Sequence, residues 1–145
     1  MELPIYVTVE EVRRVCHELG LRDWSQLDHP EITSAEAGIV RDNVGGETVS
    51  IPLTAFQNGL QVELEHGTRF PDANVTNNHP ILTGKIVLAH LRESLEYYER
   101  LQIAELEGDL LKAIEARDAD KAATVMAKLA AAKKQLAALE GKQLG

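Results

Sequence analysis

The sequence predicts an all-α protein, a compact bundle of five to six helices that ends in an alanine-rich αα-hairpin. Every proline lies in the first 80 residues, so residues 81–145 are free of the residue that most disrupts helices. Apolar residues recur at helical spacing, and several of these runs have Ser, Thr or Asp before them and Gly after them. The one alternating stretch, residues 47–52, has no second strand with which to pair.

Helix-capping residues mark the two predicted helices of the N-terminal part. Thr8 is a predicted N-cap with Glu11 three residues later, which is a capping-box spacing, and this helix ends before Gly20. Ser34 is the predicted N-cap of a second, shorter helix over residues 35–44, which ends at a pair of glycines. Both signals indicate short amphipathic helices.

Two further helices are predicted in the centre of the chain. Thr54 is the predicted N-cap of a helix that ends at His66, because Gly67 follows. Pro80 is expected in the first turn of the next helix, where its missing N–H leaves no hydrogen bond unmade. A loop over residues 67–79 connects the two.

From Pro80 the pattern is helical almost to the C-terminus. A turn is expected over residues 117–120, with Asp118 as the next N-cap, and an alanine-rich helix follows it. The helix before the turn carries one apolar stripe: Leu95, Leu101, Leu106, Leu110 and Ile114. We therefore divide the chain into a helical domain (1–104) and a C-terminal hairpin arm (105–145). The arm either packs on its own neighbour or docks on another chain, because alanine lets helix axes approach closely.

Charge and composition exclude several classes of protein. The net charge is −8, and residues 1–67 hold 12 acidic against 4 basic residues, which argues against binding to nucleic acid. No apolar run approaches the ~18 residues of a membrane span, so no membrane association is expected. A single cysteine, Cys16, falls in an apolar rhythm and is expected to be buried. The acidic N-terminus lacks the lysines of a signal peptide, which indicates an intracellular protein.

The helix predicted from Thr54 places two ionisable residues on its inward face. Phe56 and Leu60 mark that face with a spacing of four. Glu63 follows Leu60 by three residues on this face, and His66 follows Glu63 by three more. Apolar residues are expected at both positions. This is an ExxH pair on one side of a helix.

The helix predicted from Pro80 has the mirror arrangement. Leu82 and Ile86 mark its inward face, and His90 and Glu93 occupy the next positions. Helices joined by a short loop are usually neighbours and antiparallel. The sequence therefore predicts that these two pairs converge.

Three interpretations of this cluster remain open. Two imidazoles and two carboxylates form a ligand set suited to Zn, Fe or Mn, held by Glu63, His66, His90 and Glu93. The same groups would also satisfy one another as a buried salt-bridge network, with Glu63 on His90 and His66 on Glu93. The third interpretation is a cluster of surface residues without a common role.

Four sequence boxes together resemble a known domain family. They are GLQVELEHGT (59–68), NVTNNHP (74–80), TGKIVLAHL (83–91) and EYYERL (96–101). Their order and spacing resemble a small domain of bacteria and tailed phages whose function is unknown. Asn78-His79 stands where the family pattern has two aspartates, which weakens any role for acidic groups in that loop. The resemblance implies a compact helical domain and no particular activity.

The function expected from these observations is non-enzymatic. The sequence has no Gly-rich phosphate loop, no nucleophile elbow and no HExxH motif. We expect a small helical protein that acts through assembly or docking, with a protein partner or a second copy bound by the C-terminal arm. The resemblance to phage proteins implies a virion or head-associated component, located in the cytoplasm or in the virion. The alternative is a small metalloprotein that uses the Glu/His cluster.

Overall fold

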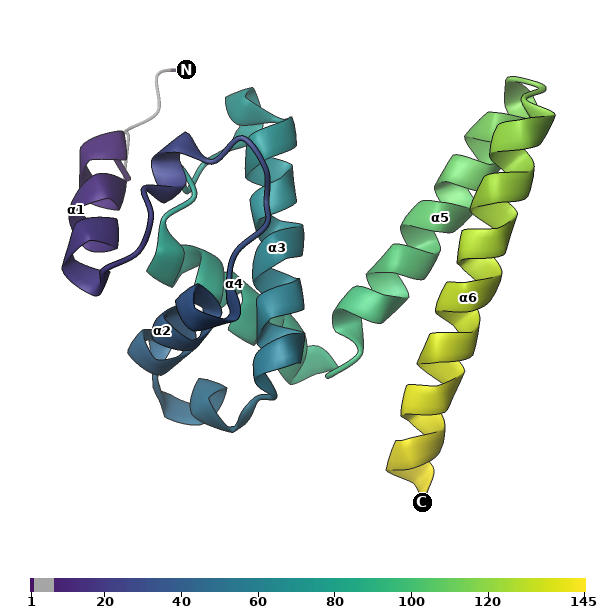
Figure 1. Cartoon of the computed structure of the whole chain (residues 1–145). Coiled ribbons are helices and arrows are strands. Elements are labelled where there is room, and N and C mark those ends of the chain that lie inside the picture. Colours follow the sequence, from purple (N-terminus) through teal and green to yellow (C-terminus); the bar gives the residue numbers. More distant parts are fainter. Residues whose placement is uncertain (2–6) are drawn as a thin grey trace. The chain divides into compact units, whose positions relative to one another are not determined.

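A computed structural model describes Met1 and residues 7–145; residues 2–6, part of the acidic N-terminus considered above, lie outside the described residues. The described residues form six α-helices and no strand, which confirms the all-α prediction (Figure 1). The helices are α1 (Val9–Leu19), α2 (Ser34–Val44), α3 (Leu53–Arg69), α4 (Pro80–Glu93), α5 (Tyr97–Glu115) and α6 (Ala119–Leu144). Three 3-10 helices lie between them: η1 (Trp24–Gln26), η2 (Gly46–Ser50) and η3 (Pro71–Ala73).

The chain divides into two units, Met1–Arg92 and Glu93–Gly145. The sequence-predicted boundary after residue 104 lies inside α5.

Most helix starts follow their predicted caps. The Thr8 hydroxyl accepts a hydrogen bond from the Glu11 N–H at the start of α1, Asp118 caps α6, and Pro80 is the first residue of α4. The cap of α2 was mispredicted by one residue, because Thr33 rather than Ser34 is the N-cap. Thr33 has a glutamate three residues later and so completes a full capping box, which Ser34 does not.

Residues 47–52 form no strand; most of them lie in η2. The helix α3 is longer than predicted, because it continues through Gly67 to Arg69.

The core of the first unit is built on large side chains that are almost fully buried: Val12, Trp24, Val40, Phe56, Leu60, Leu64 and Val87. They come from α1, η1, α2, α3 and α4, and Thr48 of η2 is fully buried as well. Cys16 is buried among them, as predicted, and burial raises the pKa of its thiol.

Glu36 is a buried carboxylate that joins three segments of the first unit. Its side chain is only 9% exposed and accepts two hydrogen bonds of 2.9 Å from the Arg22 guanidinium. It also accepts from the backbone and hydroxyl of Thr33 and from the indole N–H of Trp24. Burial alone would raise the pKa of Glu36, but these hydrogen bonds outweigh burial and lower the pKa to about 2.

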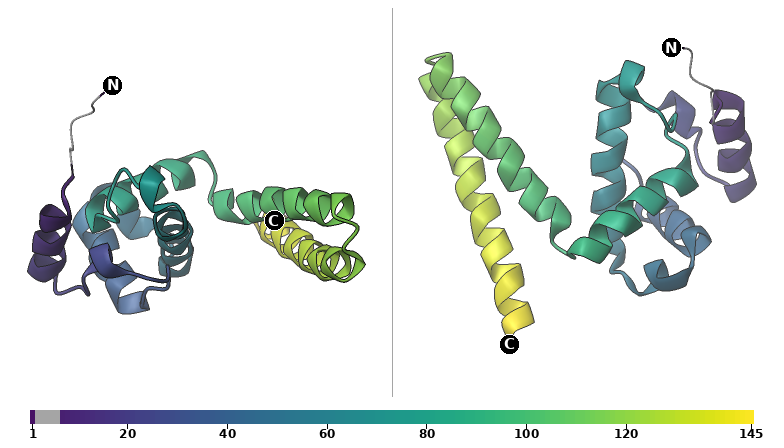
Figure 2. Two further views of the ribbon diagram at one scale, coloured as in Figure 1. Left: turned by 90° about the horizontal axis from the view of Figure 1, so that it is seen from above. Right: turned by 180° about the vertical axis from the view of Figure 1, so that it is seen from behind.

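The second unit is an antiparallel hairpin in which α5 and α6 lie side by side, as the two further views also show (Figure 2). Its buried and half-buried residues alternate at spacings of three and four: Ala122, Val125, Leu129, Ala132, Leu136 and Leu139 on α6, and Ile103, Leu106, Leu110 and Ala113 on α5. This is the heptad spacing of a two-stranded coiled coil.

The predicted stripe of α5 is only partly confirmed. Leu106 and Leu110 belong to the half-buried face, but Leu95 and Ile114 are 50% and 58% exposed. Leu95 lies in the interruption between Glu93 and Tyr97, and after Leu110 the buried position is taken by Ala113 rather than by Ile114.

The Glu36 carboxylate predicts a specific acid sensitivity. Its pKa is 4.5 in the reference state and about 2 when folded, so it stabilises the fold above pH 4.5, and this contribution is lost as the pH falls towards 2. Glu36→Gln should lower the free energy of unfolding at neutral pH by about 2–3 kcal/mol and should flatten its decline between pH 4.5 and 2. Fluorescence of Trp24, the single tryptophan, would measure denaturant unfolding at each pH. Equal acid dependence of the wild type and the variant would contradict this assignment.

Candidate functional site

The helices α3 and α4 bring Glu63 and His90 together. Glu63 Oε1 lies 3.0 Å from His90 Nδ1, a hydrogen-bonding distance. The side chain of Glu63 is 14% exposed and that of His90 30% exposed, so the pair is largely shielded from solvent. These two residues, predicted from opposite helices, therefore meet across the helix–helix contact.

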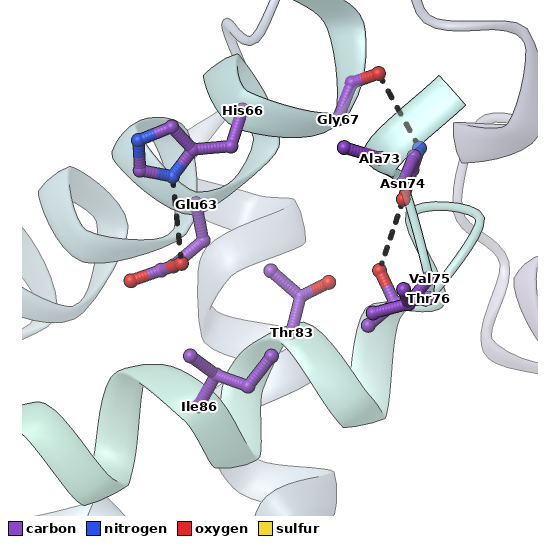
Figure 3. Close-up of a pocket in the computed structure, with 9 residues that line it drawn as sticks. All are labelled: Glu63, His66, Gly67, Ala73, Asn74, Val75, Thr76, Thr83 and Ile86. Atoms are coloured by element: carbon purple, nitrogen blue, oxygen red, sulfur yellow. Dashed lines mark hydrogen bonds and ion pairs between the residues drawn. The ribbon is translucent and has the colours of Figure 1, made fainter. Parts of the chain in front are cut away.

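His66 approaches the same carboxylate from one turn further along α3. Its Nδ1 lies 3.9 Å from Glu63 Oε2, and its side chain is 54% exposed (Figure 3). Glu63 thus has one oxygen facing each imidazole, with His90 held closely and His66 at the limit of an ion pair.

Glu93 is the last residue of α4, and its side chain is exposed. Among the residues that the structure describes, no group of three or more His, Cys, Asp or Glu side chains is arranged to hold a metal ion. The metal centre built from Glu63, His66, His90 and Glu93 therefore stays a prediction.

The buried face of α4 differs from the face used to place His90. Leu82 and Ile86 are only half-buried, whereas the buried residues are Pro80, Thr83, Gly84, Val87 and Leu91. Gly84 explains the rotation, because a Cβ at this position would lie 2.7 Å from a methyl carbon of Val44 and 3.0 Å from one of Val40. The helix turns its smallest residue towards α2, and His90 reaches Glu63 from the border of that face.

A small pocket lies beside Glu63, between the ELEHGT box and the loop before α4 (Figure 3). Its polar lining comes mainly from Glu63, His66, Asn74, Thr76 and Thr83, and its apolar lining includes Ile86. Thr83 and Ile86 project from α4 towards Glu63, and the Thr76 hydroxyl donates to the side-chain oxygen Oδ1 of Asn74. The pocket contains polar groups that already bond to one another.

Two asparagines of the loop before α4, Asn74 and Asn78, hold this region together, although the pattern of ionisable residues gives no sign of them. Asn78 is 6% exposed; its amide donates to the Trp24 carbonyl oxygen at 3.2 Å and accepts from Asn74 at 2.9 Å. Asn77 and Asn78 both have positive φ, 48° and 61°, a conformation that asparagine tolerates better than most residues. The signal in the sequence was the Asn-Asn pair of the NVTNNHP box.

Gly67 lies inside α3, and the side chains of Asn74 and Asn78 pack against it. A Cβ at this position would lie 2.2 Å from Asn78 Oδ1 and 2.7 Å from Asn74 Nδ2. The glycine therefore provides space for the two amides rather than ending the helix, which corrects the predicted stop at His66.

The hairpin carries a second candidate surface, defined by the register of α5 against α6. Arg100 pairs with Glu140 at 2.6 Å, and Glu107 pairs with Lys133 at 2.9 Å. From the first salt bridge to the second, the position on α5 moves forward by seven residues and the position on α6 moves back by seven. The next step places Ile114 opposite Met126, where an apolar pair takes the place of a salt bridge.

Ile114 and Met126 are 58% and 57% exposed, and Leu111, one turn before Ile114, is 58% exposed. We call Leu111, Ile114 and Met126 the tip patch, because they lie in the half of the hairpin next to its connecting turn.

Comparison with known proteins defines the class and then the family. The fold and the polar pocket describe a small all-helical protein, and none of the described helices is both long and apolar enough to span a membrane. Residues 12–107 match the model of a family described as a protein of unknown function (DUF5661). The chain belongs to this family, which agrees with the resemblance found in the four boxes. No curated protein and no solved structure matches the chain.

The packing around Gly67 predicts that one added methyl group lowers the free energy of unfolding at this position and not at an open one. Gly67→Ala should destabilise the first unit by about 2–3 kcal/mol, because the new Cβ would displace the buried amide of Asn78. Gly38→Ala is the matched control: it also lies within a helix, but a Cβ there meets no atom within 4 Å. The control should be neutral or stabilising by up to about 1 kcal/mol. Urea unfolding monitored by Trp24 fluorescence compares the two, and equal effects would contradict the role of Gly67.

Proposed function

We propose that this chain is a non-enzymatic helical protein that acts through assembly, with the C-terminal hairpin docking on protein. The observation that carries the proposal is the tip patch. Leu111, Ile114 and Met126 are large apolar side chains, each more than half exposed, at neighbouring positions on one face of the hairpin. Such a patch on a charged surface is typical of protein-binding sites.

The construction of the hairpin supports this proposal. Two helices in contact bury one seam, here centred on Val125, Leu129 and Ala132. The residues on either side of the seam normally pair as charges, as Glu107 and Lys133 do. Replacing one such pair by Ile114 and Met126 gives up a salt bridge and exposes apolar area, a cost that a bound partner offsets.

The setting of this proposal follows from the resemblance to bacterial and tailed-phage proteins. In that setting the chain is a virion or head-associated component, made in the cytoplasm and retained in the particle. The excess of acidic residues in the first 67 residues keeps that part of the chain away from packaged nucleic acid.

Site-directed photo-crosslinking tests the docking function. A photoreactive phenylalanine analogue replaces Leu111 in cells that naturally make the protein, and the matched control carries it at Gln102, an exposed position on the opposite face of α5. Position 111 should give one adduct of discrete mass, and position 102 should give none. Absence of an adduct at 111, or equal adducts at both positions, would contradict docking through this face.

A metalloprotein is the second candidate, and the geometry of Glu63 favours it. The two carboxylate oxygens face two imidazoles, at 3.0 Å from His90 and 3.9 Å from His66. A rotation of the exposed His66 side chain would bring two nitrogens and one carboxylate to one ion of Zn, Fe or Mn, with Glu93 one turn after His90 as a further ligand.

Metal binding and a metal-free pair predict different effects of the two histidines. If metal is bound, His66→Ala and His90→Ala should each release it, and added metal should raise the melting temperature of the wild type only. If the pair is metal-free, His90→Ala should cost about 1–2 kcal/mol, His66→Ala should be almost silent, and added metal should leave melting unchanged. Elemental analysis of protein purified without a metal-affinity column, followed by melting of each variant, separates the two.

A further inference from the structure

We infer that the partner of the tip patch is a second copy of this chain, so that two hairpins pack face to face into a four-helix bundle with both tips at the same end. This inference rests on the proposed docking function and names its partner. It follows from three properties of the hairpin: the difference between its two faces, its distribution of charge, and the position of the tip patch along it.

The two faces of the hairpin differ in composition. Beside the salt-bridged residues, the face with the tip patch carries small side chains: Ala104 on α5 and Ala123, Ala130 and Ala137 on α6, all exposed. The opposite face has Ala131 and Ala138 but is otherwise polar, with Gln102, Glu105, Asp109 and Lys112 on α5 and Lys121, Lys128, Gln135 and Lys142 on α6. Small side chains around a few large ones allow a second helical layer to approach closely. The first face combines such small side chains with the exposed large apolar ones.

The two helices have opposite charge. Between Tyr97 and Glu115, α5 has five acidic and two basic residues, whereas α6 has five lysines and two acidic residues between Ala119 and Leu144. A second hairpin is therefore favoured when its α6 covers α5 of the first, and disfavoured when like helices meet. A twofold axis parallel to the helices produces the favoured arrangement. It places α6 of the second copy over α5 of the first, and each residue keeps its position along the length of the hairpin.

The same axis matches individual residues. At equal height, Glu107 of one copy faces Lys133 of the other, and Arg100 faces Glu140, so the charges that pair within a hairpin also pair between hairpins. At the tip, Ile114 of one copy faces Met126 of the other. An axis across the hairpin would instead place each tip patch over the charged base of the other copy. Charge and patch position thus select one arrangement.

The size of the face sets the strength of the association. A helix of the length of α5 is ~28 Å long, and two helices side by side are ~20 Å wide. Such a face is at the low end of the areas that specific protein interfaces bury. The dimer should therefore dissociate on dilution, and its detection needs a wide range of protein concentration.

Sedimentation equilibrium of the full chain tests the inference with a matched pair of variants. Ile114→Lys combined with Met126→Lys replaces two of the three tip-patch residues and places like charges where the two copies face each other. Gln102→Lys combined with Ala131→Lys makes the same charge changes on the opposite face, at two exposed positions. The wild type and the control should dimerise with equal dissociation constants, and the tip variant should weaken the dimer at least about tenfold. Circular dichroism of each variant would show whether the hairpin stays helical.

The arrangement is tested by a pair of single cysteines, since Cys16 is buried. A mixture of chains with Ile114→Cys and chains with Met126→Cys, oxidised by glutathione disulfide, should form linked dimers faster than either chain alone. Equal rates would overturn the arrangement with both tips at one end. A wild type that stays monomeric at the highest concentration would overturn the second copy as partner. An adduct from position 111 with a different protein would, in that case, leave the docking function intact.

Discussion

The first unit depends on one buried amide, that of Asn78. Its nitrogen donates to the carbonyl oxygen of Trp24 and its oxygen accepts from Asn74, so the loop before α4 is joined to η1. Because the amide also occupies the space beside Gly67, it determines how closely this loop approaches α3. A buried polar group costs free energy unless each of its hydrogen bonds is made, and this requirement restricts the segment to one conformation.

The Glu63–His90 pair is a consequence of that restriction. The loop held by Asn78 leads directly into Pro80 and sets where α4 begins, while Gly84 lets α4 lie close to α2. These two constraints fix the rotation of α4, and the rotation brings His90 to the border of its buried face, within 3.0 Å of Glu63. The first three sequence boxes thus describe one connected structure, in which asparagines and glycines position the ionisable residues.

How far the sequence predicts this structure depends on whether the deciding interactions are local. The caps at Thr8 and Asp118 and the start at Pro80 were predictable, since each depends on residues within one helical turn. The spacing of Glu63 from Leu60 likewise placed it on the inward face of its helix, and its side chain is 14% exposed. Gly67 was misread as a helix stop because its role depends on side chains seven and eleven residues further on.

In the second unit, too, an interaction between distant residues was not predictable from local spacing. Its sequence pattern nevertheless becomes informative once the register of α5 against α6 is known. The stripe predicted for α5 assigns Ile114 to the buried seam, but Ala113 takes that position and Ile114 is exposed. The register became evident only from the salt bridges of Glu107 with Lys133 and of Arg100 with Glu140. Once that register is known, an exposed Ile114 opposite an exposed Met126 is no longer a random surface feature. It occupies the position where the two preceding heptads place a charge pair, and a hairpin that had only to remain folded and soluble would be served better by a third pair.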